Sequence, residues 1–291
     1  MNKHYVRCSS EHETDVRFNH NKIQLRVREC KYIGHLLTPD GVRPDADKVK
    51  AISDMRPPAD AKELHRLQGM VTYLSKFVPH LADLTAPLRQ LLRKGVSWTW
   101  TSQHDQSFNN IMQAVTSAPV LQYFDPSKPV VIQTDASSTG LRSCLLQDGK
   151  PIEFTSRALT DAETQYAQIE KELLAIVFAC IKFYQYIYGR RVVVQSDHKL
   201  LEAIFQKSIA STSRLQRMLL HLLEYNITVQ YTPGKEMYIA DTLSRSYLTK
   251  EPPSRVDRDS RGHCHLNQHE HRRRSSQQFQ NRQDLPGVRA R

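Results

Sequence analysis

The spacing of apolar residues predicts a helical unit in the first half of the chain. From Asp45 onward apolar positions recur every three or four residues, as on the buried face of a helix. Pro79 ends this pattern, and further helices are predicted over residues 81–92 and 105–117. The positions that carry the first pattern are Leu64, Leu67, Met70, Val71, Leu74 and Phe77.

The pattern changes near residue 129 to short apolar runs that are typical of strands. Strands are predicted over residues 129–135, 141–147 and 151–156, and Asp148-Gly149 is a hairpin turn sequence between the last two. A long amphipathic helix follows over residues 163–188. The remaining predicted elements are a strand at 191–197, helices at 198–206 and 213–224, a strand at 227–231 and a helix at 239–245. This order predicts a fold that contains both helices and strands (α/β in the broad sense, α+β with a mixed sheet), in which the helices pack on the sheet.

Composition places the chain among globular proteins with an excess of positive charge. Of its 291 residues, 39% are hydrophobic and 24% are charged, and the net charge is +11. Such a charge favours a polyanionic partner such as nucleic acid, although many basic proteins bind no polyanion. Residues 248–291 are rich in Arg, Ser, Gln and His and are predicted to be a disordered basic tail.

The cysteines and the apolar runs exclude several other classes of protein. Five cysteines are scattered without a CxxC pair, which predicts neither a disulfide framework nor a zinc finger. Residues 1–12 are polar and lack the apolar core of a signal peptide. No apolar run reaches the roughly 18 residues that a membrane-spanning helix needs. We therefore expect an intracellular protein, cytoplasmic or nuclear, without a membrane partner.

Two of the predicted strands end abruptly in an aspartate. Asp135 closes the run PVVIQTD and Asp197 closes RVVVQSD. Ligands of sheets flanked by helices collect at the carboxyl ends of the strands. Two aspartates at neighbouring strand ends repel each other unless a cation lies between them. Taken singly, each aspartate is equally compatible with a capping role in the turn or helix that follows.

Two further acids are candidates for the same site. Glu172 lies on one edge of the apolar stripe of the 163–188 helix, and Glu170 borders the other edge, so the spacing alone does not choose between them. Asp241 lies in the last predicted helix, where it is also compatible with a surface position. Together with the two aspartates, these acids would supply four carboxylates, and carboxylate oxygens are ligands that Mg²⁺ prefers. A pair of such ions about 4 Å apart can activate water against a phosphodiester.

Four segments together resemble the ribonuclease H (RNase H) domain of gypsy-type LTR retrotransposons. Residues 134–140 (TDASSTG) resemble its first motif and residues 166–175 (YAQIEKELLA) its helix motif. Residues 196–199 (SDHK) and 240–245 (ADTLSR) resemble the third and fourth motifs, and the four occur in the family's order.

The resemblance implies an RNase H-like fold over residues 126–247, with a five-stranded mixed sheet. It implies a hydrolase that cleaves the RNA strand of an RNA–DNA hybrid with two Mg²⁺ ions, for which Mn²⁺ can substitute. By motif match, Asp135 would bridge both ions, Asp241 would complete one site, and Glu172 and Asp197 the other. The match prefers Glu172 over Glu170 because the family's acid directly precedes Leu-x-Ala.

The resemblance extends upstream into reverse transcriptase. Residues 1–43 contain Tyr32-Ile33-Gly34-His35, which resembles the primer-grip strands at the end of the palm, with a strand predicted at 31–34. Residues 44–96 resemble the helical thumb and residues 97–125 the connecting segment. The polymerase motif Tyr-x-Asp-Asp is absent from the chain, so we expect no polymerase activity from it. The palm and fingers, which the thumb contacts in the family, are expected partners.

One departure from the family bears on activity. Where the family has Gly-Leu-Gly-Ala, this chain has Gly140-Leu141-Arg142-Ser143. An arginine that faces the crevice would compete for the acids, whereas one that faces solvent would be harmless or bind a phosphate. The alternative to an active nuclease is therefore a degenerate or domesticated fragment that binds nucleic acid without cleaving it. Retention of all four acids favours the nuclease.

Overall fold

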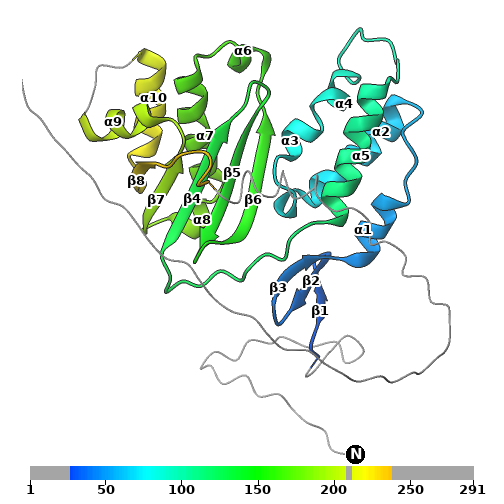
Figure 1. The fold of residues 1–291 in the computed structure, drawn as a ribbon, viewed down its shortest axis with the longest axis horizontal. Helices are drawn as coiled ribbons and strands as arrows, with labels where there is room; N and C mark the ends of the chain where they lie inside the picture. The colour runs from blue at the N-terminus through cyan, green and yellow to red at the C-terminus, as the bar shows by residue number, and fades with distance from the viewer. Residues whose placement is uncertain (1–26, 208–211, 238–291) are drawn as a thin grey trace, which may run out of the picture. The chain divides into compact units, whose positions relative to one another are not determined.

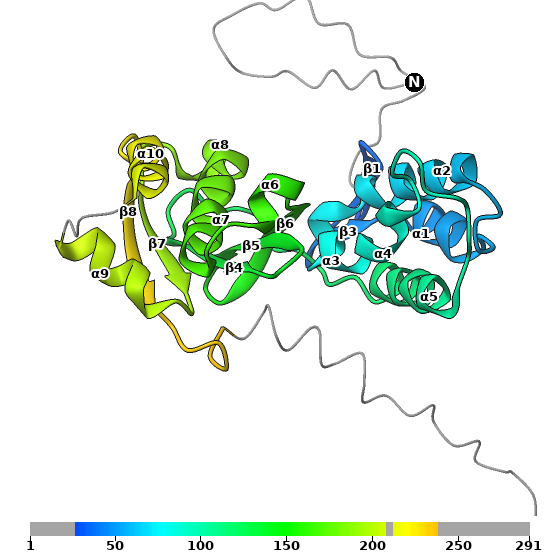
Figure 2. The same cartoon turned by 90° about the horizontal axis from the view of Figure 1, so that it is seen from above.

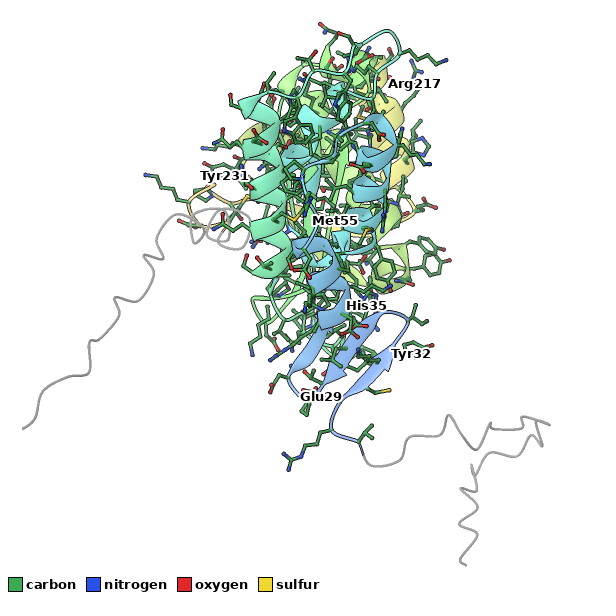
Figure 3. The ribbon with its side chains drawn as sticks, turned by 90° about the vertical axis from the view of Figure 1, so that its right-hand side faces the viewer. Glu29, Tyr32, His35, Met55, Arg217 and Tyr231 are labelled. Atoms are coloured by element: carbon green, nitrogen blue, oxygen red, sulfur yellow. The ribbon has the colours of Figure 1, made fainter. Side chains whose placement is uncertain are left out.

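The structure is a computed structural model that describes residues 27–207 and 212–237. It begins with an antiparallel sheet of β1 (Cys30–Tyr32), β2 (His35–Thr38) and β3 (Gly41–Pro44), and Figure 3 shows Tyr32 on this sheet. The strand predicted at residues 31–34 is wrong at its end, because Ile33 and Gly34 form a turn with positive φ angles of 45° and 66°. The hydroxyl of Tyr73 donates to the carbonyl of Ile33 at 2.6 Å, and a Cβ on Gly34 would collide with that hydroxyl.

The helical unit follows this small sheet. The elements are α1 (Ala46–Ser53), α2 (Ala61–Tyr73), the short 3₁₀ helix η2 (Ser75–Phe77), α3 (Leu81–Leu84), α4 (Ala86–Gln90) and α5 (Ser102–Thr116). The helix predicted at 81–92 is divided at Thr85. Pro87 lies in the first turn of α4, where a missing N–H is tolerated, but its ring would clash with the carbonyl of Asp83 in a continuous helix.

The second sheet has five strands in the order β6-β5-β4-β7-β8 (Figure 1). Its strands are β4 (Val130–Ala136), β5 (Gly140–Gln147), β6 (Lys150–Ala158), β7 (Arg191–Ser196) and β8 (Asn226–Tyr231). The pairs β4–β5 and β5–β6 are antiparallel, whereas β4–β7 and β7–β8 are parallel. This confirms the expected mixed sheet of five strands.

The helix predicted at 163–188 is three helices, α6 (Asp161–Thr164), α7 (Gln168–Lys182) and α8 (Tyr184–Ile187). Glu163 caps α6 by accepting from the backbone of Thr160 and forms two hydrogen bonds with Arg157, which fixes α6 against β6. A new helix then starts after Ala167. The last described helices are α9 (Lys199–Lys207) and α10 (Ser213–Leu222), while the predicted helix 239–245 lies outside the described residues.

The two faces of the five-stranded sheet are covered by different elements. Ile132 and Leu145 belong to the face that packs on α7, in a core shared with α9 and α10. Figure 2 shows α7, α9 and α10 beside the five-stranded sheet. Cys144 and Phe154 point to the opposite face and share a core with the helical unit, including Phe77 of η2. None of the helices in residues 27–207 and 212–237 is long and apolar enough to cross a membrane.

Candidate metal centre

Strand register brings the two strand-end aspartates together. The parallel strands β4 and β7 pair Gln133 with Gln195, whose side-chain amides are hydrogen-bonded at 2.9 Å. Asp135 and Asp197 each lie two residues beyond this pair, at the same edge of the sheet. Both parallel strands run in one direction, so their carboxyl ends open the crevice that the sequence pattern predicts.

Helix α7 adds Glu172 to this pair. Gln168, in the first turn of α7, donates both to the backbone carbonyl of Ala136 at 2.9 Å and to Oε1 of Glu172 at 2.7 Å. These bonds tie the helix to the end of β4 and orient the glutamate carboxylate. One carboxylate oxygen from each of Asp135, Glu172 and Asp197 lies within 4.8 Å of the others. Sequence reasoning missed Gln168, whose only signal was its position one turn before Glu172.

Glu170 has a different structural role. Its Oε2 accepts from the backbone of Ala167 at 3.1 Å and from Nη1 of Arg214 at 2.8 Å. It therefore caps α7 and links it to α10, while the Arg214 guanidinium stacks on the ring of Tyr166. Of the two glutamates that the spacing left open, the structure puts Glu172 beside Asp135.

Burial and the charge of Asp135 raise the pKa values of the other two carboxylates. Glu172 is 2% exposed, and this burial, together with the negative charge of Asp135, raises its pKa to about 8. Desolvation and the Asp135 carboxylate also raise the pKa of Asp197. The atom Oε2 of Glu172 is buried and has no hydrogen-bond partner. A buried acid whose pKa is raised by neighbouring acids is typical of a functional site.

This donor set fits a hard divalent cation. The three carboxylates supply only oxygen ligands, which Mg²⁺ prefers. A bound cation would be a partner for the unpartnered Oε2 of Glu172 and would offset the repulsion between the acids. The fourth predicted acid, Asp241, lies outside the described residues.

Arg142 faces the crevice and not the solvent. It is the cross-strand partner of Asp135, and its Nη2 lies 2.8 Å from Oδ2 of that aspartate. Its Nε lies 3.3 Å from Oδ2 of Asp83 in α3, and its Nη1 lies 3.1 Å from Nδ1 of His80. Asp83 and His80 are more than fifty residues away in the sequence, so local spacing gave no signal for this contact.

Comparison with known families identifies the class of domain. Residues 100–194 match the model of the RNase H-like domain found in reverse transcriptase. The matched segment includes α5, β4, β5, β6 and α7, and with them Asp135 and Glu172. The chain therefore contains an RNase H-like domain of the reverse-transcriptase kind, and this assignment supports a nuclease role of the RNase H type.

Over most of its length the chain is similar to transposon polyproteins. It is 34% identical over 249 residues to the Pol polyprotein of transposon 297 from Drosophila melanogaster, a match that covers 85% of this chain and 23% of the relative. It is 33% identical over 250 residues to the Tf2-3 polyprotein of Schizosaccharomyces pombe, covering 83% and 19%. The chain thus spans about a fifth of the length of these relatives, and its similarity to them is consistent with a fragment of a retrotransposon polyprotein.

A solved structure supports the fold. The foamy viral protease-reverse transcriptase in complex with an RNA/DNA hybrid superposes with a TM-score of 0.61 at 24% identity. The match covers 80% of this chain and 32% of the viral chain.

Proposed function

We propose that this chain is a divalent-metal-dependent endoribonuclease that cleaves the RNA strand of RNA–DNA hybrids. The observation that carries this proposal is the convergence of Asp135, Glu172 and Asp197, with carboxylate oxygens within 4.8 Å of one another, in an RNase H-like domain. The viral relative of similar fold was captured with an RNA/DNA hybrid, which supports the same substrate class here.

Some residues of the site would bind the metal ions, and another orients a metal-binding side chain. Asp135, Glu172 and Asp197 would hold Mg²⁺, and Asp241 is proposed as the fourth ligand by its motif. When bound, two such ions activate a water and stabilise the leaving oxygen of a phosphodiester. Gln168 keeps the Glu172 carboxylate turned toward Asp135 through its bond to Oε1. Glu172 must release its proton as metal binds, because a ligating carboxylate is ionised.

The test uses the full 291-residue chain with an end-labelled RNA–DNA hybrid in Mg²⁺. Asp135→Asn and Glu172→Gln should each lower the cleavage rate at least ~100-fold, because each removes a charged ligand. Two matched controls carry the same chemical changes elsewhere. Glu170→Gln alters the same helix two residues away, and Asp148→Asn alters a turn with φ of 51° that asparagine tolerates. Both controls should cleave within about threefold of the parental rate.

The outcomes separate the nuclease from the alternatives. RNA cleavage that requires the hybrid and disappears with a chelator and with both site variants supports the proposal. Loss of activity in Glu170→Gln with retention in Glu172→Gln would refute the assignment of the acids. Equal cleavage by all variants would point to a contaminating nuclease.

A second candidate function is binding of nucleic acid without cleavage, and the contact between Arg142 and Asp135 favours it. The guanidinium lies 2.8 Å from a carboxylate that the nuclease needs for metal. If the folded parental chain binds a fluorescent hybrid in an anisotropy titration but does not cleave it at any Mg²⁺ concentration, this second function replaces the first.

A further inference from the structure

The contacts of Arg142 suggest a control on metal loading, an inference that rests on the proposed nuclease function. The guanidinium contacts two acids from separate parts of the fold, Asp135 at the end of β4 and Asp83 in α3. All three side chains are about a quarter exposed, at 26%, 25% and 26% for Arg142, Asp83 and Asp135. The charges are therefore only partly screened by solvent.

The two contacts are unequal. Nη2 of Arg142 makes a short ion pair of 2.8 Å with Asp135. Its Nε lies 3.3 Å from Oδ2 of Asp83, but the geometry of this pair is not that of a hydrogen bond. Both atoms are buried and neither has a hydrogen-bond partner. A small movement of the guanidinium toward Asp83 would satisfy both atoms and release Asp135. A buried polar atom without a partner destabilises the folded protein, so forming this hydrogen bond would contribute favourably to the free energy of the movement.

Asp83 is held in place to receive the guanidinium. Its other oxygen, Oδ1, accepts from the hydroxyls of Ser137 at 2.8 Å and Thr139 at 2.7 Å. These two residues belong to the loop between β4 and β5, two and four residues after Asp135. The approach is close enough that a Cβ on Gly140 would lie 3.2 Å from Oδ1. Asp83 is thus fixed to the loop next to the metal centre, with Oδ2 left toward Arg142.

We propose that Arg142 is a built-in competitor of the metal ion at Asp135, and that Asp83 is the acid that draws its guanidinium away when metal binds. Without metal, the positive charge of Arg142 balances the negative charge of Asp135. A divalent ion must displace the Arg142 guanidinium to bind this aspartate. Asp83 lowers the cost of that displacement by offering a second carboxylate. Metal affinity then depends on a residue of the helical unit that is not itself a ligand.

The test measures metal affinity directly, with no need for turnover. Mn²⁺ is titrated into the full chain, and the free ion is counted by electron paramagnetic resonance. Arg142→Gln removes the competing charge and should tighten Mn²⁺ binding about tenfold, equivalent to about 1.4 kcal/mol. Asp83→Asn keeps an acceptor oxygen for Ser137 and Thr139 but no longer attracts the guanidinium, so it should weaken binding about threefold or more.

A double variant separates competition from general electrostatics. If Asp83 acts through Arg142, Asp83→Asn should change affinity less than about twofold in the Arg142→Gln background. An equal effect in both backgrounds would mean that Asp83 merely attracts the cation from a distance, which overturns the relay. Arg191→Gln, on an exposed position of β7, removes the same charge away from these acids and should leave affinity unchanged.

The remaining outcomes also decide the matter. Unchanged affinity in a folded Arg142→Gln chain, checked by circular dichroism, refutes the competition while leaving the nuclease proposal intact. Absence of Mn²⁺ binding in every variant, Arg142→Gln included, refutes the metal centre and the competition together. Arg142→Lys keeps the charge but not the fork of the guanidinium, so its Mn²⁺ affinity should lie closer to the parental value than that of Arg142→Gln, which distinguishes charge from packing.

Discussion

Glu172 should make the metal-free protein less stable as the pH rises. Its carboxyl is buried beside two other acids, and its pKa of about 8 exceeds the ordinary value of 4.5. Between these pH values the folded protein keeps a proton that the unfolded chain has released. The folded state therefore binds more protons, and the free energy of unfolding must fall as pH rises through this window.

The magnitude follows from the width of the window. Each pKa unit corresponds to about 1.4 kcal/mol, so a shift from 4.5 to about 8 amounts to at most about 5 kcal/mol above pH 8. That is comparable to the whole stability of many domains. Part of the loss is shared with Asp197, whose pKa is raised by desolvation and by the same neighbour, Asp135.

Urea unfolding in chelator between pH 5 and pH 9 measures this effect. Glu172→Gln should be several kcal/mol more stable than the parental chain at pH 8.5 and close to it at pH 5. Glu170→Gln, whose carboxylate is paired with Arg214, should not gain stability at high pH. Saturating Mg²⁺ should flatten the parental profile, because a bound cation favours the ionised carboxylate. Parallel profiles for the parental chain and Glu172→Gln would refute the assignment of a protonated, buried Glu172.

Three further predictions concern the contact between the helical unit and the sheet. Asp83→Ala removes the acceptor for the hydroxyls of Ser137 and Thr139 and should lower the free energy of unfolding by ~1–3 kcal/mol, measured in urea. Gly140→Ala should cost ~1–3 kcal/mol in the same assay, since its Cβ would lie 3.0 Å from a backbone carbonyl of β6. Phe77→Ala empties a fully buried position and should cost ~3–5 kcal/mol, seen as a lower midpoint in thermal unfolding.

The sequence pattern was sufficient for the strand ends of the site. Asp135 and Asp197 were predicted to meet because each closes an apolar strand, and parallel strands place their carboxyl ends at one edge. Spacing alone left the choice between Glu170 and Glu172 open, and only the motif match preferred Glu172. In the structure Gln168 bonds both the end of β4 and Glu172, which places this glutamate beside Asp135. A helical stripe defines a face but not which edge of it meets a neighbouring strand.

The errors in element boundaries have tertiary causes. Residues 163–188 keep helical spacing throughout, yet the helix is interrupted because Glu163 is held by Arg157 of β6. The crevice position of Arg142 follows from strand alternation only once its pairing with Asp135 is known. Its second partner, Asp83, lies in a helix whose place beside the sheet is fixed by core packing, and no local pattern reports such a contact.

The position of the metal centre links the two halves of the described chain. One face of the five-stranded sheet rests on α7, which supplies Glu172, and the other rests on η2 and α3 of the helical unit. Asp135 lies at the end of β4, where its carboxylate is within 4.8 Å of that of Glu172 in α7. It also forms an ion pair with Arg142 of β5, whose guanidinium in turn contacts Asp83. Any shift of α3 relative to β5 must therefore change the charge balance at Asp135. The helical unit is thus part of the electrostatic environment of the metal centre as well as a packing partner of the sheet.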